Sequence, residues 1–240
     1  PLMSFGAPMV DNIGRTERVP SLSAITGLLA NALGYDHRDA DSLTRLQSRL
    51  KFAVRCDRPG NELRDFQTVD LGQDFLDSSY AWTTWGRLDG RKGGRSAKKG
   101  THIRYRDYLA DAVYTVSVGL RDEEENPDIS AIESALIHPM RPLFIGRKCC
   151  IPSSPILIGS MNADSPLGVL QLVPPITGSR RSSAIERGLS VWWFPFDGGH
   201  HKGPYREFRV TDQRDWHNQI HSGYRILRHG LLHVRGDNDG

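Results

Sequence analysis

Apolar side chains recur at helical spacing in three segments of the chain. The helices that this spacing predicts cover residues 21–33, 42–50 and 129–137. Ser21, Asp41 and Asp128 stand where a side-chain oxygen can accept hydrogen bonds from the free N–H groups of a first helical turn. Gly34 and Pro139 follow the first and third segments and are typical of helix ends.

Alternating apolar and polar positions predict strands around these helices. The clearest run is residues 112–120, where every second side chain is apolar. Shorter strands are predicted at 52–55, 142–145, 156–158, 191–196, 207–211 and 224–234. The order up to residue 158 is helix, strand, long insertion, strand, helix, strand, which is a split β-α-β layer without its opening strand. We therefore predict an α+β fold whose first strand comes before Pro1.

The pattern changes near residue 160. Prolines and a Ser-Arg-Arg-Ser-Ser run at 179–183 interrupt regular structure, and the segments between them suit short strands. We predict a domain over residues 1–160, with a long insertion at about 76–108, and a smaller β-rich portion over 161–240.

Composition narrows the class of protein. The chain has 240 residues, 38% of them hydrophobic, which is too apolar for a mostly disordered protein. It has no run of about 18 apolar residues for a membrane helix and no opening secretory signal. Three cysteines cannot form a disulfide framework and suit a reducing compartment, so we expect a cytoplasmic protein.

The net charge of +3 hides an uneven distribution. Residues 87–106 carry eight basic side chains and one acid, Asp89, for a local charge of +7, while the rest of the chain has 23 basic and 27 acidic residues. We call residues 87–106 the basic arm; its cations are Arg87, Arg91, Lys92, Arg95, Lys98, Lys99, Arg104 and Arg106.

The basic arm suits a polyanion. It contains four glycines and is flanked by the aromatic residues Tyr80, Trp82, Trp85, Tyr105 and Tyr108. Cations can contact phosphates, and rings can stack on unpaired bases, so nucleic acid is the favoured partner. A solvated loop that only aids solubility is the alternative, and an anionic membrane fits less well because no amphipathic helix accompanies the charge.

Two further places could bind an anion. Gly146 precedes Arg147 and Lys148, and such a turn can bring backbone N–H groups and charge to a phosphate, although it can equally be an ordinary tight turn. Arg15 and Arg18 lead into the helix that starts at Ser21, where the helix dipole is positive.

Evidence for catalysis or metal binding is weaker. His217 and His221 have the spacing of a zinc-binding pair, but Asn218 stands where a zincin has its glutamate, and no third ligand is evident, so we expect no metal and no cofactor. His102 with Tyr105 or Tyr108 could serve a metal-independent ribonuclease. The aromatic cluster at 192–196 is interpreted as core rather than as a stacking surface.

Six short segments, in order, resemble one protein family. They are residues 1–6, 18–34, 52–57, 63–69, 105–112 and 143–150. Together they resemble the Cas-five family of CRISPR-associated proteins, in the type I-E branch formed by the CasD subunits of prokaryotic Cascade complexes. The resemblance covers roughly residues 1–160 and is looser beyond.

The resemblance implies a fold and a role. The fold would be a ferredoxin-like, RRM-related domain with a basic hairpin thumb in the insertion and a small C-terminal β portion. The role would be a non-catalytic subunit that binds CRISPR RNA and caps its 5′ handle, beside a CasC-type backbone subunit and a CasA-type large subunit, with target DNA at the PAM-proximal end as a further partner. The alternative is a metal-independent endoribonuclease that processes repeat RNA, because a family member does this in another subtype. The residues predicted to contact RNA are Arg15, Arg18, Ser21, Ser23, Arg55, Arg64, Arg87, Arg91, Arg95, Lys98, Lys99, Arg104, Arg106, Arg147 and Lys148.

Overall fold

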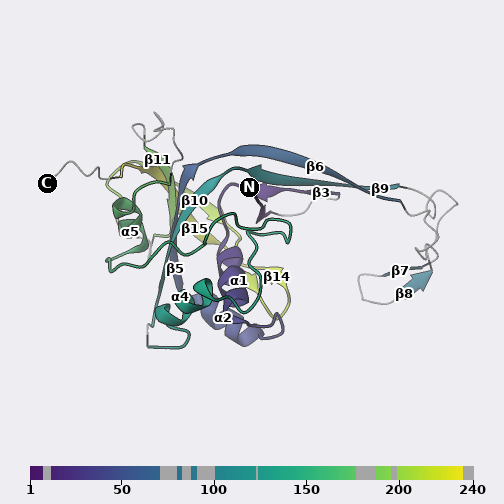
Figure 1. Ribbon diagram of the computed structural model, residues 1–240, viewed down its shortest axis with the longest axis horizontal. Helices are drawn as coiled ribbons and strands as arrows, with labels where there is room; N and C mark the ends of the chain where they lie inside the picture. The colour runs from purple at the N-terminus through teal and green to yellow at the C-terminus, as the bar shows by residue number, and fades with distance from the viewer. Residues whose placement is uncertain are drawn as a thin grey trace. The chain divides into compact units, whose positions relative to one another are not determined.

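The protein is an α+β structure of short helices and mostly antiparallel strands (Figure 1). The computed structural model describes residues 1–7, 12–70, 80–82, 88–90, 101–122, 124–176, 188–195 and 199–234, of which 69–70, 80–82, 88–90 and 101–102 are described as backbone alone. Its helices are α1 Leu22–Leu33, α2 Ala40–Arg49, α4 Ile129–Ile137 and α5 Pro166–Leu172. Its strands are β1 Leu2–Met3, β2 Phe5–Gly6, β3 Ile13–Gly14, β4 Thr16–Glu17, β5 Leu50–Arg58, β6 Asn61–Asp70, β7 Tyr80–Trp82, β8 Leu88–Gly90, β9 Thr101–Ala110, β10 Val113–Leu120, β11 Leu189–Trp193, β12 Tyr205–Val210, β13 Arg214–Asp215, β14 Ile220–His221 and β15 Arg225–Leu232.

The chain divides into two compact units. Unit 1 comprises residues 1–6, 16–62 and 109–240, and unit 2 comprises residues 7–15 and 63–108. No helix in the described part of the chain has both the length and the apolar character needed to cross a bilayer.

The centre of unit 1 is an antiparallel sheet. In the described residues its strand order is β10-β5-β11-β15-β12. Val54 of β5 lies opposite Val116 of β10 on one side and Trp192 of β11 on the other. Strand β15 then pairs with β11 and with β12, so strands from both ends of the chain share one sheet.

Apolar side chains cover both faces of this sheet. Phe52 and Val54 belong to the cluster that packs with the buried faces of α1, α2 and α4, including Leu29 and Leu46. The apolar cluster on the other face is smaller: Ala53, Val191 and Trp193 pack with Leu167 and Leu170 of α5. Figure 1 shows α5 on the opposite side of β5 from α1 and α2.

The predicted helices are confirmed, with one shifted start. Ser21 caps α1 by accepting from the Ala24 N–H, and Gly34 ends it with a φ of 84°. Asp128 caps α4 by accepting from the Ala131 N–H. Helix α2 begins at Ala40, two residues before the predicted start, with Asp39 at the cap position.

The strand predictions have a mixed outcome. The predicted strands at 52–55 and 112–120 correspond to β5 and β10, and those in the last third to β11, β12 and β15. The expected strands at 142–145 and 156–158 are wrong, because those residues form irregular turns. Helix α5 was not expected: Pro166 occupies its first turn and Ser165 caps it, so the proline starts this helix rather than preventing one.

The predicted division at residue 160 is not a division of the fold. Strands β11, β12 and β15 extend the sheet that contains β5 and β10, and the segment after residue 160 belongs wholly to unit 1. A separate C-terminal domain would need its own core, whereas Trp193 shares its buried cluster with Ala53.

Unit 2 contains the strands that border the predicted insertion. Strand β9 pairs with β6 and, in parallel, with β3, where Tyr105 lies opposite Ile13. Strands β7 and β8 pair antiparallel with each other. Most of the interval 76–108, which was predicted to be the insertion, lies outside the described residues.

The first residues of the chain form strand β1 in unit 1. Leu2 pairs with Ala110 and Met3 with Leu109, and Met3 and Phe5 pack with Leu109 and Ala112 in a small cluster. The expectation of a further strand before Pro1 stays a prediction.

Candidate nucleic-acid interface

Strands β6 and β9 present cations and aromatic rings together in unit 2. The Arg64 guanidinium donates to both carboxylate oxygens of Asp107, with Nε–Oδ1 at 2.7 Å and Nη2–Oδ2 at 3.1 Å. The same guanidinium carbon lies 5.9 Å from the Tyr105 ring centre, and Phe66 meets Tyr105 edge-on at 5.6 Å between centroids. We call Arg64, Phe66, Tyr105 and Asp107 the ribbon cluster.

The ribbon cluster is held in place yet open to solvent. The Arg64 side chain is 56% exposed and Phe66 is 55% exposed. The Asp107 carboxylate, through its hydrogen bonds and charge, raises the pKa of Arg64. Because a bidentate pair and a cation–π contact orient the guanidinium, its remaining N–H groups are presented at little further entropic cost.

Further cations lie next to members of the ribbon cluster along the strands of unit 2. Arg104 and Arg106 flank Tyr105 on β9, and both are half-buried. Arg15 is exposed and directly follows β3, whose Gly14 lies opposite Arg106. Cations next to exposed rings match the needs of an unpaired nucleic-acid strand, whose phosphates and bases alternate.

The predicted glycine turn exists in unit 1. Gly146 has a φ of 94°, and a Cβ there would overlap the Ser4 carbonyl oxygen. The Ser4 N–H donates to the Ile145 carbonyl, and the Cys150 N–H to that of Arg147, which ties the turn to the start of the chain. Lys148 is exposed and Arg147 half-buried at its tip, so the turn presents charge from a fixed backbone.

The start of α1 is not the open anion site that was predicted. Asp212 already occupies it: its carboxylate accepts from the Leu22 N–H at 2.9 Å and its carbonyl from the Ser23 N–H at 3.1 Å. The Ser21 hydroxyl accepts from the Ala24 N–H, so the free N–H groups of Leu22, Ser23 and Ala24 all have partners, and the Ile25 N–H makes the first intrahelical bond to the Ser21 carbonyl. A carboxylate at this position repels a phosphate.

The hydroxyl groups at this helix start are also engaged. Ser21 Oγ lies 3.0 Å from Ser23 Oγ, which lies 3.0 Å from Nε2 of His221. Arg18 is 81% exposed and pairs with Glu62 at 3.0 Å. An exposed pair of this kind contributes little and opens readily to another anion.

Arg55 was predicted to contact RNA, but the structure buries it. Its side chain is 0% exposed and bonds the Asp57 carboxylate at 2.5 Å. Its other N–H groups donate to the carbonyls of Leu170, Val173 and Pro174, at and beyond the end of α5. Arg55 therefore supports the core and does not face RNA.

Five predicted residues lie outside the described part of the chain: Arg87, Arg91, Arg95, Lys98 and Lys99. The side chain of His102 also lies outside it, and Tyr108 is only 3% exposed, so Tyr108 does not form an accessible catalytic pair with His102.

The histidines that suggested metal binding serve other contacts. His217 lies in the turn between β13 and β14, and His221 is the last residue of β14, so the two histidines are not one turn apart on a helix as the zinc pattern requires. His217 Nε2 lies 3.1 Å from Asp41 and His221 contacts Ser23. Among the described residues, no three His, Cys, Asp or Glu side chains gather in a way that could hold a metal ion.

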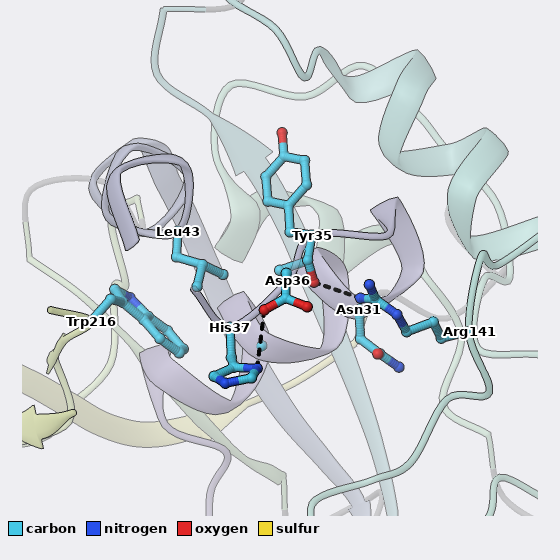
Figure 2. Close-up of a pocket in the computed structure, with 9 residues that line it drawn as sticks. Asn31, Tyr35, Asp36, His37, Leu43, Arg141 and Trp216 are labelled. Atoms are coloured by element: carbon cyan, nitrogen blue, oxygen red, sulfur yellow. Dashed lines mark hydrogen bonds and ion pairs between the residues drawn. The ribbon is translucent and has the colours of Figure 1, made fainter. Parts of the chain in front are cut away.

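A pocket of about 360 Å³ lies at the C-terminal end of α1 (Figure 2). Leu43 and Trp216 form its apolar lining. Its polar rim is paired within itself: His37 contacts Asp36 at 3.2 Å and Arg141 donates to the Tyr35 carbonyl. None of the predicted RNA-binding residues lines it.

Sequence reasoning overlooked two members of the ribbon cluster, Phe66 and Asp107. Phe66 was not singled out, although it is a large exposed aromatic residue on β6. The signal was present, because Phe66 lies two positions from Arg64 and such residues share one face of a strand.

Known proteins resemble this chain along most of its length. A family model described as CRISPR-associated protein (Cas_Cas5) matches residues 1–228. The Cascade subunit CasD of Escherichia coli (strain K12) is 29% identical over 187 residues, which covers 74% of this chain and 75% of that protein.

Solved structures show the same fold. A chain of a CRISPR RNA-guided surveillance complex superposes with a TM-score of 0.67 at 24% identity, over 98% of this chain and 87% of that one. A structure described as a Cas protein has a TM-score of 0.61 at 24% identity, over 98% of this chain and 94% of that one.

Proposed function

Because the chain belongs to the CRISPR-associated Cas5 family, we propose that it is the guide-RNA-binding subunit of a type I-E Cascade complex that caps the 5′ handle of the guide. The similarity to the E. coli Cascade subunit CasD supports membership of such a complex. The observation that carries RNA contact is the ribbon cluster, where an oriented arginine lies beside the half-buried ring of Tyr105 and that ring meets the exposed ring of Phe66.

The ribbon cluster suits a single strand better than a duplex. Arg64 is already oriented by Asp107, so its outward N–H groups meet a phosphate without ordering a free side chain. Phe66 offers a ring to an unpaired base, whereas paired bases in an RNA helix do not expose their faces. The handle of a guide is the part that such a surface would hold.

The proposed RNA-contacting residues follow from exposure and charge. Arg55 is left out because it is buried. Ser21 and Ser23 are left out too, because their hydroxyls are engaged at a helix start that Asp212 occupies. The proposal keeps Arg15, Arg18, Arg64, Arg104, Arg106, Arg147 and Lys148 and, on charge alone, the arm cations Arg87, Arg91, Arg95, Lys98 and Lys99.

The proposal extends to fold, partners and chemistry. Unit 1 would be a ferredoxin-like, RRM-related layer and the insertion a basic hairpin thumb. The neighbours would be a CasC-type backbone subunit, a CasA-type large subunit and target DNA at the PAM-proximal end. The subunit holds RNA without cutting it, and repeat cleavage falls to another subunit.

Removing cations from the arm tests this function. We expect the variant K98A/K99A/R104A/R106A to lose guide RNA from the assembled complex, because it removes contacts to phosphates. Each lost phosphate contact is also expected to lower the slope of log affinity against log salt concentration by about 0.7. The measurement is RNA retained by the complex across a series of salt concentrations.

The control removes equal charge elsewhere. The arm is also tested with the smaller variant K98A/K99A, which removes two positive charges. Its control is R38A/R45A, which removes two positive charges from exposed positions on and before α2. The proposal fails if the arm variants and R38A/R45A have the same RNA retention and the same salt slope.

A further inference from the structure

The last strand of the sheet in unit 1 has one open side. Strand β12 pairs with β15, and among the described strands it pairs with no other. Five of its six residues, from Tyr205 to Arg209, are exposed. Alternate residues of an antiparallel strand direct their N–H and C=O groups away from the paired neighbour. The free edge of β12 therefore presents main-chain donors and acceptors to solvent.

The side chains of β12 alternate between the two faces of the sheet. Arg206 and Phe208 share a face with Val210, which packs against the same apolar cluster as α1 and α2. Tyr205 and Arg209 lie on the opposite face. The Tyr205 and Phe208 residues are each 45% exposed. Each face therefore brings one exposed ring and one arginine to the free edge.

The arginines at this edge lack acidic partners. Neither Arg206 nor Arg209 forms an ion pair within the described part of the chain. The Arg209 guanidinium carbon lies 5.1 Å from the Tyr224 ring centre, and this cation–π contact orients it. Glu207, the one acid of β12, already pairs with Arg228 at 2.8 Å. The free charge along the edge is therefore positive on both faces.

The geometry of this edge selects among possible occupants. A nucleic-acid strand stacks its bases along one surface, whereas Tyr205 and Phe208 lie on opposite faces of the sheet. A second copy of β12 would bring the arginines of both chains together along one seam, where like charges repel. An extended peptide fits, because it satisfies the main-chain groups of the edge and places its own side chains alternately on both faces.

We infer that the free edge of β12 binds an extended acidic segment of another protein, which adds to the sheet as a further strand. Acidic side chains of that strand pair with Arg206 and Arg209, and apolar side chains cover Tyr205 and Phe208. For an antiparallel strand the order is acidic, apolar, any residue, acidic, apolar, with the middle position opposite Glu207. This contact uses none of the residues that are proposed to hold RNA.

The test uses the full chain and a synthetic strand of this pattern. The labelled peptide Ser-Gly-Glu-Val-Thr-Glu-Val-Gly-Ser is titrated with the protein, and binding is measured by fluorescence anisotropy. The variant R206E/R209E is expected to bind this peptide roughly tenfold more weakly, because two attractive cross-strand pairs become repulsive. The same variant is expected to gain affinity for the matching peptide in which both glutamates are lysines, a result that loss of folding does not produce.

Methylated peptides test the main-chain contacts, and a matched variant tests the place of the charge. Two further peptides carry N-methyl groups on alternate residues, one on the odd positions and one on the even positions. Only one of these sets directs its N–H groups toward β12, so one peptide is expected to lose binding and the other to keep it. R38E/R45E reverses the same charge in the α2 region and is expected to bind the acidic peptide like the unaltered chain.

Three results would overturn the inference. The first is that R206E/R209E binds the acidic peptide like R38E/R45E, or that both methylated peptides bind like the parent peptide. The second is that R206E/R209E loses binding of labelled oligo-U but keeps the peptide, which assigns the edge to nucleic acid. The third is a dimer of the full chain that Phe208→Ser dissociates, which assigns the edge to a second copy. Guide retention by the arm variant tests the proposed function separately, so either can fail alone.

Discussion

Arginine has opposite roles at different positions in this chain. Arg55 is fully buried and Arg64 is more than half exposed, although each pairs with an aspartate. Arg49 repeats the structural role, since its guanidinium donates to the carbonyls of Asp122 and Pro127 in the loop before α4. A buried arginine that satisfies orphan carbonyls is part of the core, and only its exposed counterparts are available to RNA.

At the scale of single residues, Gly146→Ala tests the turn that presents Arg147 and Lys148. We expect it to lower the free energy of unfolding by about 2 kcal/mol or more, because alanine resists the positive φ and its Cβ overlaps the Ser4 carbonyl. Urea denaturation measures the change. Gly119→Ala is the control, since a Cβ there meets nothing within 4 Å, and an equal loss in both variants would refute the special role of Gly146.

Helix α1 shows how an element can be predicted correctly and its chemistry incorrectly. Its bounds and caps follow from Ser21 and Gly34, which are local features. Its N-terminus is closed by Asp212, a residue 190 positions away in the chain. Asp212 therefore attaches the segment after β12 to the positive end of the α1 dipole. The carboxylate of Asp212 also pairs with Arg225.

At the scale of elements, Asp212→Ala tests this attachment. We expect it to lower the free energy of unfolding by about 2–4 kcal/mol, because it leaves the Leu22 N–H of α1 and the largely buried Arg225 without their carboxylate. Glu62→Ala breaks the exposed pair with Arg18 and is expected to cost under about 1 kcal/mol. Similar urea midpoints for the two variants would contradict the assignment.

The sheet of unit 1 joins the two ends of the chain. Strand β5 lies between β10 and β11, so it is a central strand only because residues after 160 complete the sheet. Helix α5 then covers the face that carries Ala53 and Trp193. Residues on both sides of the predicted boundary therefore share one core.

At the scale of the whole molecule, cutting the chain tests this shared core. We expect residues 1–160 and 161–240, expressed separately, to lack cooperative unfolding transitions, because each leaves buried apolar faces such as those of Val54 and Val191 uncovered. Circular dichroism during urea titration measures this. Amide exchange of the intact chain gives an independent check, since β5 and β15 are expected to open with similar free energies, and two separately folding halves would refute the shared core.

The local features of this protein can be predicted from its amino-acid sequence alone. Caps and apolar spacing placed α1 and α4, alternation placed β5 and β10, the charge pattern singled out the basic arm, and six short segments indicated the family. These signals lie within a few residues of one another, so propensity and periodicity report them directly.

Which polar groups are available to a ligand depends on the packing of segments that are distant in the sequence. Arg55 reaches the Leu170 carbonyl across 115 positions, and Asp212 closes a helix 190 positions away, so neither role has a signal in the neighbouring sequence. The same reason explains the missed continuation of the sheet after residue 160 and the exposed rings of β12 at its edge. Exposure depends on which distant segments pack together, and that is a property of the fold rather than of any local pattern.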